Sequence, residues 1–212
     1  TNIYRRFNNQ QDPPLLRLKK NLRLSKDISN TRHYKMVKKY KREISYLMRK
    51  VLITGGAGYI GAATTQLFLK KNFLVFAVDN LSTGKNLLTH KNYLFIKSDY
   101  SSNHILNLLK KEKIQDVIHL AASIDNNESV LNPKKYYQNN FFKLIKFLEN
   151  FKKAKIKNFI FSSSAAVYGE VKTFKPLAEN FILTPSSPYG ISKMKGEMLI
   201  RKKKYFNSII LR

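Results

Sequence analysis

The chain has 212 residues, enough for one domain with or without a tail, and it contains no cysteine. This excludes a disulfide framework, a cysteine-based metal site and a cysteine nucleophile. The four histidines, at 33, 90, 104 and 119, lack the spacing of metal ligands, so no bound metal is expected. No apolar run is long enough to span a bilayer, and no secretory signal is evident. We therefore expect a cytoplasmic protein without a membrane partner.

Positive charge extends over the whole chain, with 40 Lys and Arg against 13 Asp and Glu. Residues 1–50 hold 15 of the basic residues against 3 acidic ones, and residues 51–212 hold 25 against 10. A basic surface of this size binds nucleic acid non-specifically at low salt. However, Lys, Asn, Ile and Phe are abundant together, as an AT-rich coding sequence produces. We therefore expect no physiological nucleic-acid partner for the body of the chain.

A domain boundary is predicted near residue 48. Residues 1–47 are basic and polar and include no strand-like run, although 15–24 and 34–48 have the spacing of short amphipathic helices. We treat 1–47 as an extension without an assigned role, and a nucleic-acid or membrane-surface arm stays open as an alternative. Residues 48–212 form the predicted functional domain.

From residue 51 onward, apolar strand patterns alternate with helical patterns. Strands are predicted at 51–54, 73–78, 93–96, 116–120, 158–162 and 207–211. Helices are predicted at 59–71, 102–113, 133–152 and 188–204, with Asn132 as an N-cap and Pro133 as the first helical residue. This alternation predicts an α/β fold, a doubly wound parallel sheet with helices on both faces.

The first predicted strand runs into glycines at 55, 58 and 61. Glycine accepts positive φ and lets the backbone approach a ligand closely. The N-terminus of the following helix offers N–H groups and a positive dipole end to a phosphate. The turn therefore predicts a dinucleotide pyrophosphate site, with tight packing as the plain alternative.

The second predicted strand ends in Asp79, 18 residues past Gly61. Dinucleotide folds place a carboxylate near this position to hold the adenosine ribose hydroxyls. Because a carboxylate repels a 2′-phosphate, NAD is favoured over NADP. The alternative is a residue that only shapes the turn at the strand end, continued by Asn80.

Tyr189 and Lys193 lie four residues apart, on one face of a predicted helix. A free tyrosine, with a pKa of about 10, is a poor base at neutral pH, and a nearby ammonium lowers the pKa of such a phenol. A tyrosine in this setting can take a proton from an alcohol while hydride leaves for a nicotinamide. A surface tyrosine beside a solvated lysine is the alternative.

The strand predicted at 158–162 ends in three hydroxyls, Ser162, Ser163 and Ser164. They stand at the carboxyl end of the sheet, where ligands bind in open α/β folds. Ser164 is the candidate for orienting a substrate hydroxyl or carbonyl oxygen toward Tyr189. Alternatively, the hydroxyls satisfy backbone groups of the turn.

Four motifs occur in this order: Thr54-Gly55-Gly56-Ala57-Gly58-Tyr59-Ile60-Gly61, Asp79-Asn80-Leu81-Ser82, Ser162–Gly169 and Ser187-Pro188-Tyr189-Gly190-x-Ser-Lys193. Together they resemble the extended short-chain dehydrogenase/reductases over about residues 49–212, and within that family most closely the UDP-glucose 4-epimerases. The stretch from Ser162 is epimerase-like, because related dehydratases usually carry an Asp-Glu pair there.

The resemblance implies a Rossmann-like domain, a permanently bound NAD and a nucleotide-sugar substrate such as a UDP-hexose, and it leaves a homodimer open. Sugar C4 would be oxidised transiently, and hydride would return to the opposite face. The implied catalytic residues are Ser164, Tyr189 and Lys193. The implied cofactor-binding residues are Gly55, Gly58, Tyr59, Ile60, Gly61, Asp79, Asn80, Asp99, Tyr100, Leu120, Ala121, Ala122, Asn139, Tyr189 and Lys193. Of these, Asp99 and Tyr100 would flank the adenine.

Two departures from the family pattern bear on this expectation. Related epimerases often carry a cofactor-contacting lysine four residues after the position of Leu120, where this chain has Ile124. The chain also stops at Arg212, before the C-terminal substrate domain that grips UDP, so rate as well as affinity should suffer. An NAD(P)-linked nucleotide-sugar reductase or dehydratase, or a truncated non-catalytic NAD-binding remnant, therefore remain alternatives.

Overall fold

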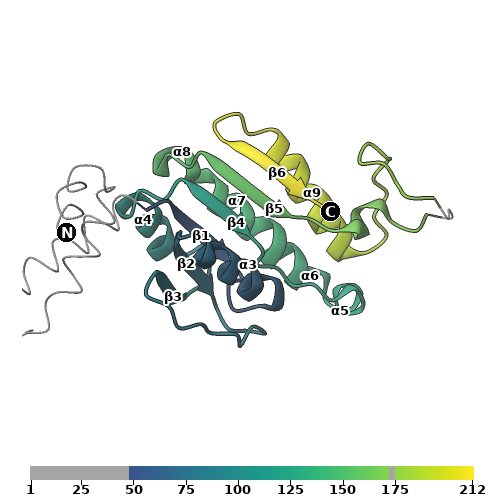
Figure 1. Cartoon of the computed structure of the whole chain (residues 1–212). Coiled ribbons are helices and arrows are strands. Elements are labelled where there is room, and N and C mark those ends of the chain that lie inside the picture. The colour runs from purple at the N-terminus through teal and green to yellow at the C-terminus, as the bar shows by residue number, and fades with distance from the viewer. Residues whose placement is uncertain (1–47, 172–174) are drawn as a thin grey trace, which may run out of the picture. The chain divides into compact units, whose positions relative to one another are not determined.

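The computed structural model describes residues 48–171 and 175–212, and Lys50–Arg212 form one compact unit (Figure 1). The extension predicted at 1–47 lies outside the described residues. Among the described helices, none is both long and apolar enough to cross a membrane.

A six-stranded parallel sheet in the order β3-β2-β1-β4-β5-β6 forms the centre of this unit. The strands are β1 (Lys50–Thr54), β2 (Leu74–Asp79), β3 (Tyr93–Lys97), β4 (Asp116–His119), β5 (Asn158–Ser162) and β6 (Asn207–Leu211). The chain runs outward from β1 to β3 and then crosses back to β4. Open parallel sheets bind ligands at the carboxyl ends of the strands beside such a reversal.

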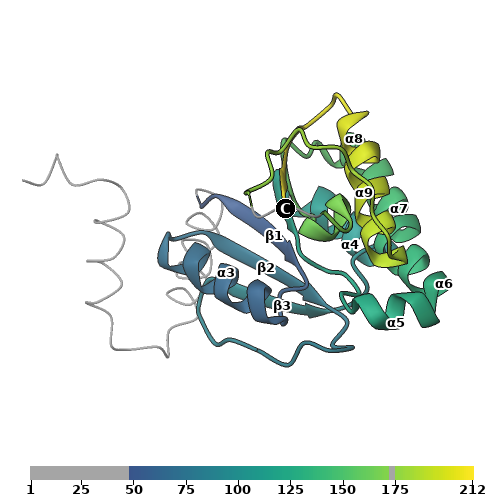
Figure 2. The ribbon, with the colours of Figure 1, turned by 90° about the vertical axis from the view of Figure 1, so that its right-hand side faces the viewer.

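Helices cover both faces of the sheet, and Figure 2 shows α3 on one side with α4, α7 and α9 on the other. The longer helices are α3 (Tyr59–Lys70), α4 (Asn103–Lys111), α7 (Lys143–Glu149) and α9 (Pro188–Arg201). The shorter ones are α5 (Asn126–Leu131), α6 (Pro133–Tyr136), the π-helix η1 (Tyr137–Phe142), α8 (Phe151–Ala154) and the 3₁₀-helix η2 (Ala165–Tyr168). The doubly wound α/β fold predicted from the sequence is therefore confirmed.

Alternate residues of the central strands pack into two separate cores. On β1, Leu52 packs into the larger core with Phe147, Phe159 and other residues beneath α4, α7 and α9. Its neighbours Val51 and Ile53 face the smaller core under α3. Successive strand side chains point to opposite faces, so a strand buried on both faces is apolar throughout. Burial of these strands on both faces fixes the positions of their carboxyl ends, where the site lies.

All six predicted strands are present, with ends within two residues of those expected. The helix predicted at 133–152 is instead divided into α6, η1, α7 and α8. Pro133 begins α6 as predicted, and the Asn132 side chain accepts a hydrogen bond from Lys135 N. Two short helices, α5 and η2, were not predicted, because each is too short to show helical periodicity.

Candidate active site

A cavity of about 630 Å³ opens at the carboxyl ends of the central strands, within the usual size of a ligand pocket. Every residue predicted for cofactor binding lines it, from the glycine turn to α9: Gly55, Gly58, Tyr59, Ile60, Gly61, Asp79, Asn80, Asp99, Tyr100, Leu120, Ala121, Ala122, Asn139, Tyr189 and Lys193. Ser164 is not among the lining residues. The fold thus gathers fifteen of the sixteen predicted positions around one space.

The glycine turn, residues 55–61 between the end of β1 and the first turn of α3, is constrained by packing and also lines the cavity. Gly55 has φ +70°, and a Cβ at Gly61 would lie 1.9 Å from Gly55 O, so the fold requires glycine at both positions. At Gly58, a Cβ would meet only Gly55 O, at 3.3 Å. Gly58 is also the N-cap of α3, where no side chain accepts from the first N–H groups. The N–H groups of residues 55–58 already donate within the protein, so the donors left for a phosphate are those of the first turn of α3.

Asp79 ends β2 and is nearly buried, at 8% exposure. Its Oδ2 accepts from Ala57 N at 3.0 Å and its Oδ1 from Leu81 N at 2.8 Å. The carboxylate therefore ties the glycine turn to the loop after β2, so Asp79 shapes the turn as the alternative expected. Each carboxylate oxygen keeps further acceptor capacity toward the cavity.

The loop after β2 contributes a group of lining residues that the sequence analysis missed: Ser82, Thr83, Gly84, Lys85 and Asn86. Asn86 N donates to Ala57 O at 2.9 Å, and a Cβ at Gly84 would lie 2.7 Å from Ala57 C. Glycine at 84 lets this loop rest on the glycine turn. The sequence signal that could have identified this loop was Gly84, a glycine in a polar segment shortly after the acid that ends β2.

Tyr100 and Asn139 join β3 to the helical layer at the far end of the cavity. The Tyr100 hydroxyl donates to Asn139 O at 2.6 Å, and burial raises the pKa of Tyr100. The Asn139 Nδ2 donates to the Ser123 hydroxyl at 3.1 Å. The next residue, Asn140, bonds the backbone of Ser123 in both directions. The π-helical turn η1 allows these consecutive asparagines to hold the same loop after β4.

Lys193 reaches the cavity from α9 and is only 3% exposed. Its Nζ donates to Ser162 O at 2.8 Å and lies 5.0 Å from the centroid of the Phe161 ring. Burial lowers the pKa of Lys193 to about 8, so the side chain is still mainly an ammonium at pH 7. Because an ammonium carries three N–H donors, two remain for groups in the cavity.

Tyr189 is half-buried at the start of α9, one turn before Lys193. Its backbone N donates to the Ser129 hydroxyl at 3.2 Å, and its ring packs edge-on against Tyr136, with centroids 6.3 Å apart. Ser187 caps the helix by accepting from Gly190 N at 3.1 Å. These contacts fix the turn that carries the tyrosine. Tyr189 and Lys193 stand one turn apart on α9, and both line the cavity.

The three consecutive serines that begin with the last residue of β5 have different surroundings. Ser162 supplies the carbonyl that accepts from Lys193, and Ser163 donates to Glu197 Oε1 at 2.5 Å. Ser164 accepts from Ala166 N at 3.2 Å and so caps η2. The cavity lining includes Ser162 and Ser163. At Ser164 the hydroxyl satisfies a backbone group, as the alternative expected, and its substrate role stays a prediction.

The family described as "NAD dependent epimerase/dehydratase family" matches residues 51–212. The chain belongs to this family. A UDP-glucose 4-epimerase from Lactobacillus helveticus is 38% identical over 152 residues, which cover 71% of this chain and 46% of that protein. A curated UDP-glucose 4-epimerase from Lacticaseibacillus casei is 36% identical, with 45% of its length covered. The chain spans about half the length of the curated UDP-glucose 4-epimerases it matches.

Solved structures of epimerases have the same fold. The UDP-Glc/GlcNAc 4-epimerase of Campylobacter jejuni superposes with a TM-score of 0.72 at 38% identity, over 77% of this chain and 52% of that one. The UDP-glucose 4-epimerase of Thermus thermophilus, solved with NAD, has a TM-score of 0.72 at 28% identity and covers 77% and 54%. That of Thermotoga maritima, solved with UDP-glucose, has a TM-score of 0.71 at 33% identity and covers 77% and 54%.

Proposed function

We propose that residues 48–212 form the NAD-binding and catalytic part of a nucleotide-sugar 4-epimerase acting on UDP-hexoses of the UDP-glucose/UDP-galactose type. The observation that carries the proposal is that one cavity is lined by the glycine turn, Asp79, Tyr189 and Lys193. Similarity to epimerases solved with NAD and with UDP-glucose supports the choice of cofactor and substrate class.

The groups that line the cavity fit NAD in chemical kind. The uncapped N–H groups in the first turn of α3 suit the pyrophosphate, and Asp79 with Asn80 offers acceptors to the adenosine ribose. Asp79 also disfavours a 2′-phosphate, which supports NAD rather than NADP. Lys85 offers a cation from the loop after β2, although Ile124 stands where related epimerases often carry a lysine.

Bound NAD would supply the acceptor, and later the donor, of the hydride at sugar C4. Tyr189 would take the proton of the C4 hydroxyl and return it in the reverse step, so the reaction consumes no proton overall. The ammonium of Lys193 would favour the phenolate of Tyr189 and direct its two remaining N–H groups to the nicotinamide ribose. Ser164 would orient the sugar. The net reaction is redox neutral.

Two measurements test this proposal. The chain should bind NAD, seen as quenching of its tyrosine fluorescence, and should convert UDP-glucose to UDP-galactose without net formation of NADH. The matched control is Tyr189→Phe, which keeps the ring that packs on Tyr136 but removes the acid/base group. We expect this variant to bind NAD and to lose at least about 100-fold in turnover.

The alternatives give different results in the same assays. Net change in NADH with turnover would favour a reductase, because epimerisation leaves the cofactor unchanged. Loss of water from the sugar without a net change in NADH would favour a dehydratase, because dehydration is also redox neutral. Binding of NAD with no turnover of any UDP-hexose would favour a non-catalytic NAD-binding module. No binding of NAD at all would contradict the cofactor site itself.

A further inference from the structure

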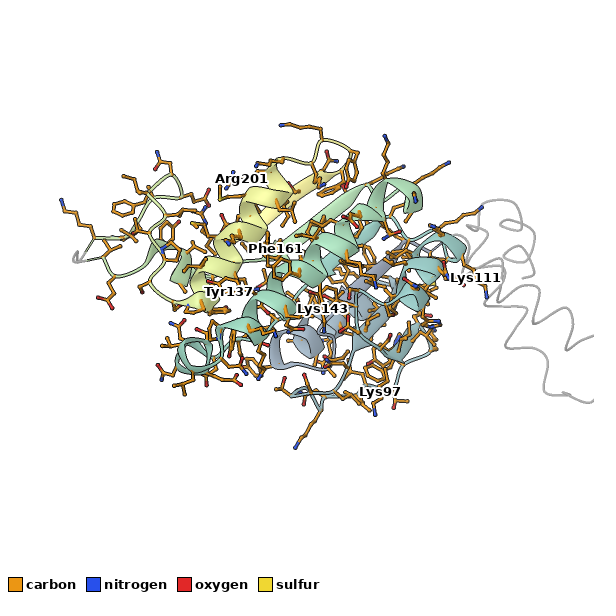
Figure 3. The ribbon with its side chains drawn as sticks, turned by 180° about the vertical axis from the view of Figure 1, so that it is seen from behind. Lys97, Lys111, Tyr137, Lys143, Phe161 and Arg201 are labelled. Carbon is orange, nitrogen blue, oxygen red and sulfur yellow. The ribbon has the colours of Figure 1, made fainter. Side chains whose placement is uncertain are left out.

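Lys143 contacts two residues that line the proposed cofactor site: Asp99, which the family resemblance places beside the adenine, and Asn139. It is the first residue of α7, in the helical layer in front of the sheet in Figure 3, where its side chain is labelled. Its Nζ lies 2.5 Å from Asp99 Oδ2 and 3.3 Å from Asn139 Oδ1. Asp99 and Asn139 both line the cavity, whereas Lys143 itself stands behind them.

The Asp99 carboxylate is held from two sides. Lys143 takes one oxygen, and the other accepts from both the backbone N and the hydroxyl of Ser101, at 2.9 and 2.8 Å. Burial alone would raise the pKa of Asp99, but the hydrogen bonds from Lys143 and Ser101 outweigh it and lower the pKa. Asp99 is therefore a fixed, ionised acceptor at neutral pH. Lys143 and Asp99 are 29% and 30% exposed, so water screens the pair only partly.

Lys143 also fixes the orientation of the Asn139 amide. Because the ammonium can only donate, the oxygen of the amide must face it. The amide nitrogen then faces Ser123, which follows β4. One cation thus sets the direction of a carboxylate and of an amide on the same wall of the cavity.

We propose that Lys143 is a positioning residue for the adenine end of the cofactor, acting mainly through Asp99. The inference rests on the proposed NAD site. The exocyclic amino group of adenine is a donor, and a fixed carboxylate is a suitable acceptor for it. Without Lys143, Asp99 loses a partner and much of its restraint, so binding has to order it again.

The test compares dissociation constants for NAD in the wild type and in variants of one helix. Lys143→Met should weaken binding about fivefold, the size expected for a partly screened pair, and Lys143→Arg should stay within about twofold of wild type. The control is Lys146→Met, an exposed lysine of the same helix, which removes equal charge and should also stay within about twofold. Lys143→Gln is measured beside Lys143→Met in case that variant folds poorly.

A double-mutant cycle with Asp99→Asn shows whether Lys143 acts through Asp99. In the Asp99→Asn background, Lys143→Met should change NAD affinity by less than about twofold. An undiminished effect in that background, an equal loss in Lys146→Met, or unchanged affinity in Lys143→Met would overturn the inference. Those results would leave the NAD site standing, whereas a wild-type chain that binds no NAD would overturn the proposed function and this inference together.

Discussion

A methyl group at Gly58 would touch one backbone oxygen at 3.3 Å, whereas one at Gly61 would lie 1.9 Å from the same oxygen, Gly55 O. Gly58 also has φ −74°, which alanine adopts readily. We therefore expect Gly58→Ala to change the free energy of unfolding by less than about 1 kcal/mol, and Gly61→Ala to lower it by about 3 kcal/mol or more. Urea unfolding measures both.

The affinity for NAD provides a second test of Gly58→Ala. Gly58→Ala places a methyl group at the wall of the cavity, so we expect about tenfold weaker binding in a protein that is still folded. If Gly58→Ala bound NAD as tightly as wild type, the glycine turn would not be the pyrophosphate site.

The buried charge of Lys193 lowers the stability of the fold, so replacing Lys193 with an uncharged residue should raise it. Burial lowers the pKa of Lys193 from 10.5 to about 8, so the buried ammonium opposes folding at neutral pH. We expect Lys193→Met to raise the free energy of unfolding by about 2 kcal/mol at pH 7 while abolishing turnover.

The difference in the free energy of unfolding between Lys193→Met and wild type should depend on pH. It is fully present below about pH 8, shrinks as the pH rises toward 10.5 and vanishes above that value, where wild-type Lys193 is neutral in both folded and unfolded chains. Urea unfolding at pH 7 and pH 10 measures it, and exposed Lys202→Met serves as the control. A variant less stable than wild type at pH 7 would contradict this account.

Most residues that the motifs named for the site line the cavity, whereas residues that tertiary contacts bring to the site were not predicted. Gly55 and Asp79 stand next to strand ends, and the apolar runs determine where those strands end. Lys143 carries no such signal, because only the tertiary fold brings the start of α7 beside Asp99, in the segment after β3. Nor does the sequence distinguish Ser163 from Ser164, since neighbouring serines look alike until Glu197 takes the hydroxyl of Ser163.

At the scale of elements, a buried ion pair joins α9 to the ends of β5 and β6. Glu197, 1% exposed, accepts from Arg212 at 2.9 and 2.6 Å and from Ser163 at 2.5 Å. Arg212 also donates to the hydroxyl of Tyr168 in η2. The pair therefore holds the turn after β5, next to Ser162, whose carbonyl accepts from Lys193.

Breaking this pair should destabilise the fold. Glu197→Gln leaves the guanidinium of Arg212 buried without a charged partner, so we expect a loss of about 3 kcal/mol at pH 7 by urea unfolding. The exposed Glu149→Gln is the matched control.

The effect of Glu197→Gln should also vary with pH. Burial raises the pKa of Glu197, but hydrogen bonds from Arg212 and Ser163 outweigh this and lower it. The carboxylate therefore stabilises the fold above about pH 4.5, and its contribution falls as the pH drops through the lowered value. Equal losses of unfolding free energy in Glu197→Gln and Glu149→Gln at pH 7 would show that the Glu197–Arg212 pair does not stabilise the fold.

The interrupted helix between β4 and β5 shows where periodicity stops being informative. The sequence of 133–152 has a helical pattern throughout, yet the chain makes a π-helical turn over Tyr137–Phe142. The turn is selected by contacts from elsewhere, with Tyr100 on Asn139 O and Ser123 on Asn140. Such contacts join residues far apart in the sequence, so no local pattern predicts them.

At the scale of the whole molecule, the sheet order and the position of the cavity follow from a few rules. Right-handed crossovers and the alternation of strands and helices restrict the topology, and the reversal beside β1 places the site. The position of the cavity was therefore predictable from the sequence without knowledge of all the residues that line it. The loop of residues 82–86 was not, because loops without periodicity are placed by what they pack against.

The central claim is that hydride leaves sugar C4 and returns to the same carbon from the other face. UDP-glucose carrying deuterium at C4, incubated with the chain and NAD, tests it directly by mass spectrometry and NMR of the products. We predict UDP-galactose with the deuterium still at C4 and no accumulation of NADH. Deuterium moved to another carbon or retained in the cofactor, or no 4-epimer from an NAD-bound chain, would contradict the claim.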